Sequence, residues 1–196
     1  MRDKINDRII IVGESVILKE ISPEFFSYLI KWRNDKNLNK YINQKVELTM
    51  ESQISWYENI YLKDDTQGLF VVVDKTSNTP IGTLGWTDMD YDNRRVVTGR
   101  MLLIDKTYAE KFLEACLLES DFLYQTVDIM YGHVVKDNKK ALRMNKFLGY
   151  CVNTEEIIYP HELLVAGMEQ VELFRNRETF MHIREKLYYQ VKMSIL

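Results

Sequence analysis

The chain has 196 residues, of which 46% are hydrophobic and 28% charged, and its formal net charge is -3. This size and composition predict a single soluble globular domain, residues 1–196, with a sizeable core. Because the charge is slightly negative and no basic cluster stands out, we expect no nucleic-acid partner. The first residues, MRDKINDRIIIVGES, contain no long apolar run, so we expect neither a signal peptide nor a membrane span.

The cysteines and histidines do not predict a metal site. Cys116 and Cys151 lie in a predicted helix and a predicted strand, without the spacing of metal ligands. We interpret them as buried free thiols, which suit a reducing cytoplasm. His133, His161 and His182 are scattered along the chain and lack paired ligands.

The first half of the chain predicts a strand, two helices and three more strands. Alternation predicts an edge strand over 16–21, and Ser22 followed by Pro23 predicts a helix that continues through Trp32. Thr49, with Glu51 in the first turn, predicts a second helix that ends near residue 62. Apolar runs separated by polar turns then predict strands over 69–74, 81–87 and 96–104.

The second half predicts alternating helices and strands. Apolar residues at helical spacing predict a helix over 108–124. The stretch VDIMYGHVVKDNKKALRMNKFLGY predicts a strand over 127–135, a turn at Asp137-Asn138 and a helix over 138–147 that stops at Gly149-Tyr150. An antiparallel strand pair over 151–158 and 168–175 and a helix over 178–191 complete the chain.

This order of elements, with the strand-Asn-helix-Leu-Gly-aromatic pattern of residues 127–150, resembles the GCN5-related N-acetyltransferase (GNAT) fold. The resemblance covers about residues 14–180. It implies a mixed α+β fold whose mostly antiparallel sheet contains one parallel pair, strands four and five, that splays apart. In the family acetyl-CoA enters this gap, which we expect near Leu102 and Met130. The resemblance therefore implies an N-acetyltransferase that transfers acetyl from acetyl-CoA to a small amine by direct attack in a ternary complex.

The resemblance also implies contacts to acetyl-CoA from the fourth strand and from the starts of two helices. One departure is the family's glycine-containing diphosphate loop, which is replaced by KTYAEKF, residues 106–112, without glycine. There, Thr107 and Glu110 fit a capping box, whose carboxylate would repel a diphosphate, and two lysines could offset this repulsion. The implied contacts are Met101, Leu102, Leu103, Lys106, Thr107, Lys111, Asn138 and Ala141.

Two N-terminal segments resemble the sugar-nucleotide and ribosomal-protein-type branch of the family. They are KWRNDKNLNKYINQ and TMESQISWYEN. The resemblance implies that their two helices close over the acceptor, for example an amino group on a nucleotide-linked sugar. The aromatic residues fit equally as core residues, and the Arg-Asn pair fits as a solvated helix end. The predicted acceptor contacts are Arg33, Asn34, Tyr41, Trp56 and Trp86.

Asn145 and His133 are the candidates for catalysis. Asn145 lies seven residues after Asn138, where many relatives carry a proton-donating Tyr, and an amide donates a hydrogen bond but supplies no proton. Val97 replaces the Glu that often acts as the base in relatives of this type. His133 on the fifth strand is an alternative base, as are Asp88, Asp90 and Asp92, and an acceptor that arrives neutral needs none.

Two other functions remain open at this stage. The altered loop favours a non-catalytic GNAT-like module that has lost acetyl-CoA binding, and a transferase with a different acyl donor keeps the same fold. The residues alone do not identify the acceptor. The segment YPHELLVAGMEQ, residues 159–170, fits a solvent loop or a contact in a homodimer.

Overall fold

The structure of the chain, a computed structural model, describes residues 3–42, 44, 46–154 and 167–195. One eight-stranded sheet runs through it in the order β1-β2-β3-β4-β5-β6-β8-β7. The strands are β1 (Ile10–Val12), β2 (Val16–Glu20), β3 (Gly68–Asp74), β4 (Thr79–Asp90), β5 (Arg95–Leu103), β6 (Ile129–Val135), β7 (Cys151–Val152) and β8 (Gln170–Asn176). The α-helices are α1 (Phe26–Asn34), α2 (Met50–Asn59), α3 (Ala109–Leu123), α4 (Lys139–Phe147) and α5 (Arg177–Ile195).

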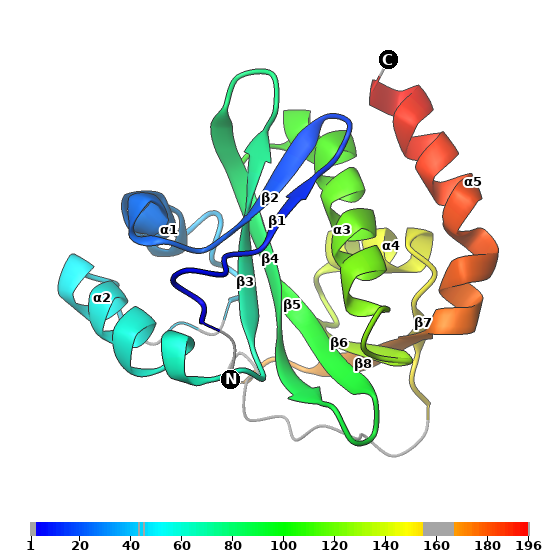
Figure 1. Cartoon of the computed structure of the whole chain (residues 1–196). Helices are drawn as coiled ribbons and strands as arrows, with labels where there is room; N and C mark the ends of the chain where they lie inside the picture. The colour runs from blue at the N-terminus through cyan, green and yellow to red at the C-terminus, as the bar shows by residue number, and fades with distance from the viewer. Residues whose placement is uncertain (1–2, 43, 45, 155–166, 196) are drawn as a thin grey trace.

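Helices cover both faces of the sheet. Helices α1 and α2 lie on one side, and α3, α4 and α5 lie on the other (Figure 1). The main core contains buried residues such as Phe112 and Leu117 of α3. A second cluster of buried residues, which includes Phe26 of α1 and Tyr57 of α2, lies on the α1–α2 side of the sheet. Every residue of β3 is buried, because this strand lies under both layers, which explains its unbroken apolar run.

All strand pairs are antiparallel except β5 and β6. The predicted mixed α+β class, with one parallel pair in a mostly antiparallel sheet, is therefore confirmed. This parallel ladder begins where Arg95 lies opposite Ile129 and ends where Thr98 lies opposite Gly132. Both strands continue beyond that point, so the sheet opens between them.

Two strand predictions need correction, and one strand was not predicted. The three-residue strand β1 was not predicted, although its residues are β-branched and apolar; it is mostly exposed and pairs with β2. Residues 16–21 therefore do not form an edge strand. The strand predicted over 151–158 is observed at Cys151–Val152, and residues 155–166 lie outside the described residues, as does most of segment 159–170.

Local signals set the starts of the N-terminal helices. The Thr49 hydroxyl accepts from Ser52 N at 3.1 Å and the Ser52 hydroxyl accepts from Thr49 N at 2.9 Å, which forms a capping box at the predicted start of α2. Pro23 begins a 3₁₀ turn, Pro23–Phe25, that leads into α1, and Ser22 makes no side-chain cap. Helix α2 ends at Asn59, earlier than predicted, and a second 3₁₀ turn follows.

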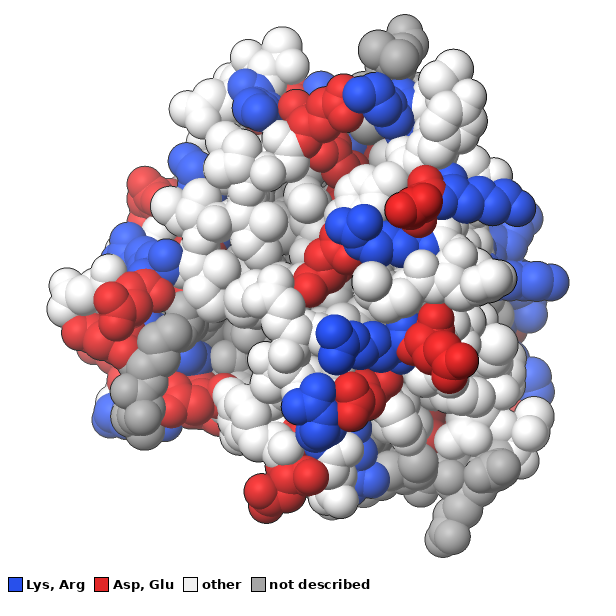
Figure 2. Space-filling view, turned by 45° about the vertical axis from the view of Figure 1, so that its right-hand side comes forward, with Lys and Arg blue, Asp and Glu red and all other residues white. Residues whose placement is uncertain are grey.

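Acidic and basic side chains are interspersed on the face drawn in Figure 2, where no region of one sign dominates. Within the described parts of the chain, none of the helices combines the length and the apolar character needed to cross a membrane.

Candidate active site

The parallel strands β5 and β6 part near the middle of the sheet. Their last ladder pair joins Thr98 to Gly132. Met130 still pairs with Val96, whereas Leu102 has no partner on β6 in the part of the chain that the structure describes. The opening therefore begins two residues further along β6 than expected, at the carboxyl ends of both strands.

Strand β5 presents an open backbone edge in this gap. Residues 99–103 pair with β4, at Gly99, Leu102 and Leu103, and no described residue of β6 pairs with them. Because a strand directs N–H and C=O groups to both of its neighbours, the groups on the β6 side are available to an extended ligand chain. The predicted contacts Met101, Leu102 and Leu103 all lie on this segment.

A β-bulge bends β5 at Arg100. Gly99 lies opposite Gly85 and Leu102 opposite Thr83, so two residues of β5 face one of β4. Arg100 has a φ of 51°, in the left-handed region that residues with a Cβ rarely adopt. The Thr83 hydroxyl donates to the Arg100 carbonyl at 2.8 Å. The chain thus changes direction where β5 leaves β6.

A carboxylate lies at the N-terminal end of α3, where the resemblance places a diphosphate. Asp105 Oδ1 accepts from Thr107 N at 2.8 Å and from Thr107 Oγ1 at 2.9 Å. These bonds, backbone and side chain, hold the pKa of Asp105 below its ordinary value. The predicted capping box of Thr107 and Glu110 is wrong, because the Thr107 hydroxyl donates to Asp105 and α3 begins only at Ala109.

The two lysines of this region are not equivalent. Lys111 Nζ lies 2.6 Å from Asp74 Oδ1, and the Asp74 side chain is 6% exposed. Its charge is therefore matched by a nearly buried carboxylate at the end of β3. Lys106 is exposed next to Asp105, and its positive charge contributes to the low pKa of that carboxyl.

Asn138 caps helix α4. Asn138 Oδ1 accepts from Ala141 N at 3.2 Å, so both predicted cofactor contacts take part in the start of the helix. Asn145 is buried on the same helix, and its Nδ2 donates to the Ala141 carbonyl at 2.9 Å. One amide proton of Asn145 is thus bound to its own helix, and the other is its remaining donor.

His133 lies on β6 directly after the last residue paired with β5. Its Nε2 is 2.9 Å from Glu172 Oε2 on β8, and the Glu172 side chain is fully buried. Asn153 Nδ2 donates to the other carboxylate oxygen at 2.6 Å. A carboxylate fixed in this way orients the imidazole, as an efficient general base requires. Glu172 and Asn153 gave no signal in the sequence, since both are distant from His133 along the chain.

Asn34 has a structural role in the loop between α1 and α2. Its Nδ2 donates to the Leu48 carbonyl at 2.9 Å, and its Oδ1 accepts from Leu48 N at 2.9 Å and Gln44 Nε2 at 3.0 Å. These bonds occupy the amide, so we leave Asn34 out of the proposed acceptor site. Tyr41 is half-buried in the same loop, with Lys40 Nζ 5.0 Å from its ring centroid.

Trp56 and Trp86 lie on opposite faces of the sheet. Trp56 is half-buried on α2, and its ring centroid is 5.3 Å from that of Tyr61 in the second core cluster. Trp86 belongs to the main core and packs against Phe70 and Phe122. A small acceptor cannot reach both faces, so we keep Trp56 in the proposed site and assign Trp86 to the core.

Arg100 extends from the bulge towards α2 and is a candidate site residue that sequence reasoning missed. Its Nη2 donates to Gln67 Oε1 at 2.6 Å, and its guanidinium carbon lies 5.8 Å from the Trp56 ring centroid. Its Nη1 is buried and has no hydrogen-bond partner among the described residues. Gln67 is itself oriented by Asp64, whose Oδ2 accepts from Gln67 Nε2 at 2.7 Å.

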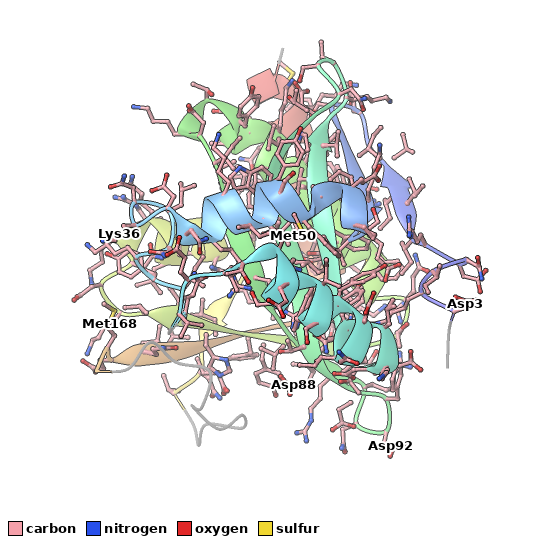
Figure 3. The ribbon with its side chains drawn as sticks, turned by 90° about the vertical axis from the view of Figure 1, so that its left-hand side faces the viewer. Asp3, Lys36, Met50, Asp88, Asp92 and Met168 are labelled. Atoms are coloured by element: carbon pink, nitrogen blue, oxygen red, sulfur yellow. The ribbon has the colours of Figure 1, made fainter. Side chains whose placement is uncertain are left out.

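Arg33, at the end of α1, contributes a second positive charge. Burial lowers the pKa of both arginines, and the charge of Arg33 adds to the lowering at Arg100. The carboxylates of Asp64 and Asp88 act on Arg100 in the opposite direction, without an ion pair to it among the described residues. Asp88 lies below α2 in Figure 3, which faces the α1–α2 side of the molecule.

The sheet order, the parting of the parallel pair and the two helix layers together define the GNAT fold. A comparison of the sequence with models of protein families and with curated proteins finds no match. Solved structures do match, and they share the fold. One is a GCN5-related N-acetyltransferase from Brucella melitensis, with a TM-score of 0.76 and 15% identity, over 94% of this chain and 86% of that one.

Two further matches have described ligands or substrates. FdhC, a nucleotide-linked sugar GNAT solved in its apo form, has a TM-score of 0.72 and 18% identity, over 91% of this chain and 96% of that one. Spermidine N-acetyltransferase from Vibrio cholerae, solved with CoA and spermine, has a TM-score of 0.71 and 16% identity, over 86% of this chain and 99% of that one. At these identities the likeness establishes the fold of the chain.

Proposed function

We propose that the protein is an acetyl-CoA-dependent N-acetyltransferase that acts on a small amine, such as an amino group on a nucleotide-linked sugar. The observation that carries this proposal is the opening after the Thr98–Gly132 pair, where β5 has an unpaired backbone edge. An extended pantetheine arm can add to such an edge by main-chain hydrogen bonds. A spermidine N-acetyltransferase of the same fold has been solved with CoA.

The reaction would be a direct transfer. The amine lone pair attacks the thioester carbonyl carbon, the C–N bond forms, the C–S bond breaks, and CoA leaves as its thiol after taking up the proton that the amine loses. His133 would remove that proton, since Glu172 orients its ring. A backbone N–H near the bulge would stabilise the oxyanion. The remaining amide proton of Asn145 would hydrogen-bond to the sulfur.

Calorimetric titration with acetyl-CoA tests the proposal. We expect a dissociation constant in the micromolar range and release of CoA thiol when an amine acceptor is added. Undetectable binding at millimolar acetyl-CoA would overturn the transferase assignment. Titration with free CoA serves as the matched comparison, because it has the same diphosphate and pantetheine without the acetyl group.

A non-catalytic GNAT-like module is the second candidate function, and Asp105 favours it. This exposed carboxylate accepts hydrogen bonds from Thr107 at the site expected for a diphosphate, and Lys111 is held by Asp74. A transferase that uses a different acyl-CoA would meet the same obstacle, whereas an acyl group bound to another carrier need not contain a diphosphate. The titration separates these functions, because a module without affinity for acyl-CoA produces no heat with either acetyl-CoA or CoA.

We also propose that the protein works in the cytoplasm on a small-molecule amine, without a nucleic-acid partner. Cys116 and Cys151 are both free; Cys116 is buried as predicted, whereas Cys151 is exposed. An exposed free thiol suits a reducing compartment. Cell fractionation tests this location. The homodimer stays a prediction, because residues 159–166 lie outside the described residues, and sedimentation equilibrium measures it.

A further inference from the structure

We propose that the acceptor carries an oxyanion, either a carboxylate or a phosphate, and that the guanidinium of Arg100, assisted by Arg33, binds it. This inference rests on the proposed transferase function and adds the chemical class of the acceptor. The amine to be acetylated would then lie at the opening of the sheet, with the anionic group towards α1 and α2.

Arg100 has no charged hydrogen-bond partner in the part of the chain that the structure describes. Its Nη2 is held by Gln67, a neutral acceptor, at 2.6 Å. Its Nη1 is buried and has no partner among the described residues. A buried donor without an acceptor destabilises the folded protein. An oxyanion matches the planar fork of donors in a guanidinium and would satisfy the unpaired nitrogen.

The backbone that presents Arg100 is strained. A left-handed φ of 51° is unfavourable for a non-glycine residue, and such strain clusters at ligand sites. The bulge turns this side chain to the α2 side, within 5.8 Å of the Trp56 ring centroid. It lies two residues beyond Thr98, the last residue of β5 paired with β6. The guanidinium therefore originates at the opening where the amine must react.

The charges around Arg100 also favour an anionic ligand. Arg33 is close enough for its charge to act on Arg100, and it also has no ion-pair partner among the described residues. The carboxylate of Asp64 accepts hydrogen bonds from Thr66 and from Gln67, the residue that holds Arg100. Two arginines without a direct carboxylate contact attract an anion and repel a polycation such as a polyamine.

Four amines that differ in charge test the substrate class. Phosphoethanolamine, β-alanine and ethanolamine share a two-carbon spacing between the amine and a phosphate, a carboxylate or a neutral hydroxyl group, and spermidine is the cationic comparison. We expect kcat/KM to be at least tenfold higher for an anionic amine than for ethanolamine, and lowest for spermidine. The two anionic amines distinguish phosphate from carboxylate. Equal rates for all four, or a preference for spermidine, would overturn the inference.

Binding of the preferred anionic amine, measured by calorimetry, provides a readout that does not depend on activity. Arg100→Gln should weaken it about 10- to 100-fold, as expected for the loss of a charge-assisted hydrogen bond. Arg94→Gln is the matched control, because Arg94 has the same φ of 51° and also loses one positive charge, but lies exposed in a pair with Asp128. Equal effects of the two substitutions would refute the site.

Acetyl-CoA titration of the same proteins tests the proposed transferase function separately from the oxyanion site. If acetyl-CoA binds but the anionic amines bind no better than ethanolamine, the inference fails and the proposed function stands. If acetyl-CoA does not bind while anion binding requires Arg100, the transferase function fails and the oxyanion site stands as a binding site.

Discussion

The imidazole of His133 and the carboxylate of Glu172 lie 2.9 Å apart, between Nε2 and Oε2, and join β6 to β8 beside the opening in the sheet. The Glu172 side chain is fully buried, and that of His133 is 12% exposed. A buried carboxylate that orients a nearly buried imidazole is an arrangement suited to proton transfer.

Replacement of His133 tests its role as the base. His133→Gln should lower kcat by about 100-fold or more, the usual contribution of a general base, and leave the affinity for acetyl-CoA unchanged. His182→Gln is the control, since His182 is exposed on α5. Steady-state kinetics and calorimetry give the two readouts. If both variants are equally active, His133 is not the base. An acceptor amine that binds in its neutral form would explain this result.

Asp105 should weaken acyl-CoA binding by repulsion of the diphosphate. Asp105→Asn removes the charge and preserves an oxygen that accepts from Thr107, because Asn is as good a helix cap as Asp. We expect the affinity for acetyl-CoA to rise about fivefold, a small gain because exposed charges repel each other weakly in water. Asp92→Asn, in the exposed turn after β4, controls for net charge. Unchanged affinity would place the diphosphate elsewhere.

Asn138 has two roles that two substitutions separate. Asn138→Ala should lower the free energy of unfolding by about 1 kcal/mol, because the bond from Ala141 N is lost. It should also weaken acetyl-CoA binding by about 1 kcal/mol if the amide contacts the cofactor. Asn138→Asp keeps the cap and removes the amide donor. Urea unfolding and calorimetry on both variants show whether stability and binding change together. If Asn138→Asp binds acetyl-CoA with wild-type affinity, the amide of Asn138 does not contact the cofactor.

Glu119 on α3 should make the protein less stable as the pH rises. Its side chain is buried, its Oε1 has no partner among the described residues, and burial raises the pKa of this carboxyl well above 4.5, more than the charge of Arg175 lowers it. Folding therefore favours the protonated form, and the unfolded chain ionises first. The contribution of Glu119 to stability is largest below about pH 4.5 and declines as the pH rises towards the folded-state pKa of this carboxyl.

Glu119→Gln should remove this pH dependence. The variant should be more stable than the wild type at pH 8, by about 1–3 kcal/mol, and the difference should disappear at pH 4. Urea denaturation from pH 4 to 8 measures both. Glu58→Gln, at an exposed position on α2, should change stability little at any pH. A constant difference across the range would show that the carboxyl of Glu119 stays ionised in the folded protein.

Much of the fold could be predicted because its signals are local. Thr49 begins α2 through a bond to a residue three positions away, and the apolar run of β3 reflects burial on both sides. The sequence did not show that Trp86 packs in the main core, because a strand residue faces one side or the other according to its register with neighbouring strands. That register is set by pairing with Gly68 and Thr98, which are far from it in sequence.

By itself, the sequence determined the order of the elements, since periodicity and turn chemistry act over a few neighbouring residues. The resemblance to the GNAT fold implied the mixed sheet and the placement of His133 on the strand that borders the opening. Only the tertiary structure decided that Arg100 reaches Gln67, 33 positions away, and that Glu172 orients His133, 39 positions away. The residues of one strand do not specify which distant residues will lie beside it in the sheet. The side chains proposed to select the acceptor and to remove its proton are thus each positioned by long-range contacts.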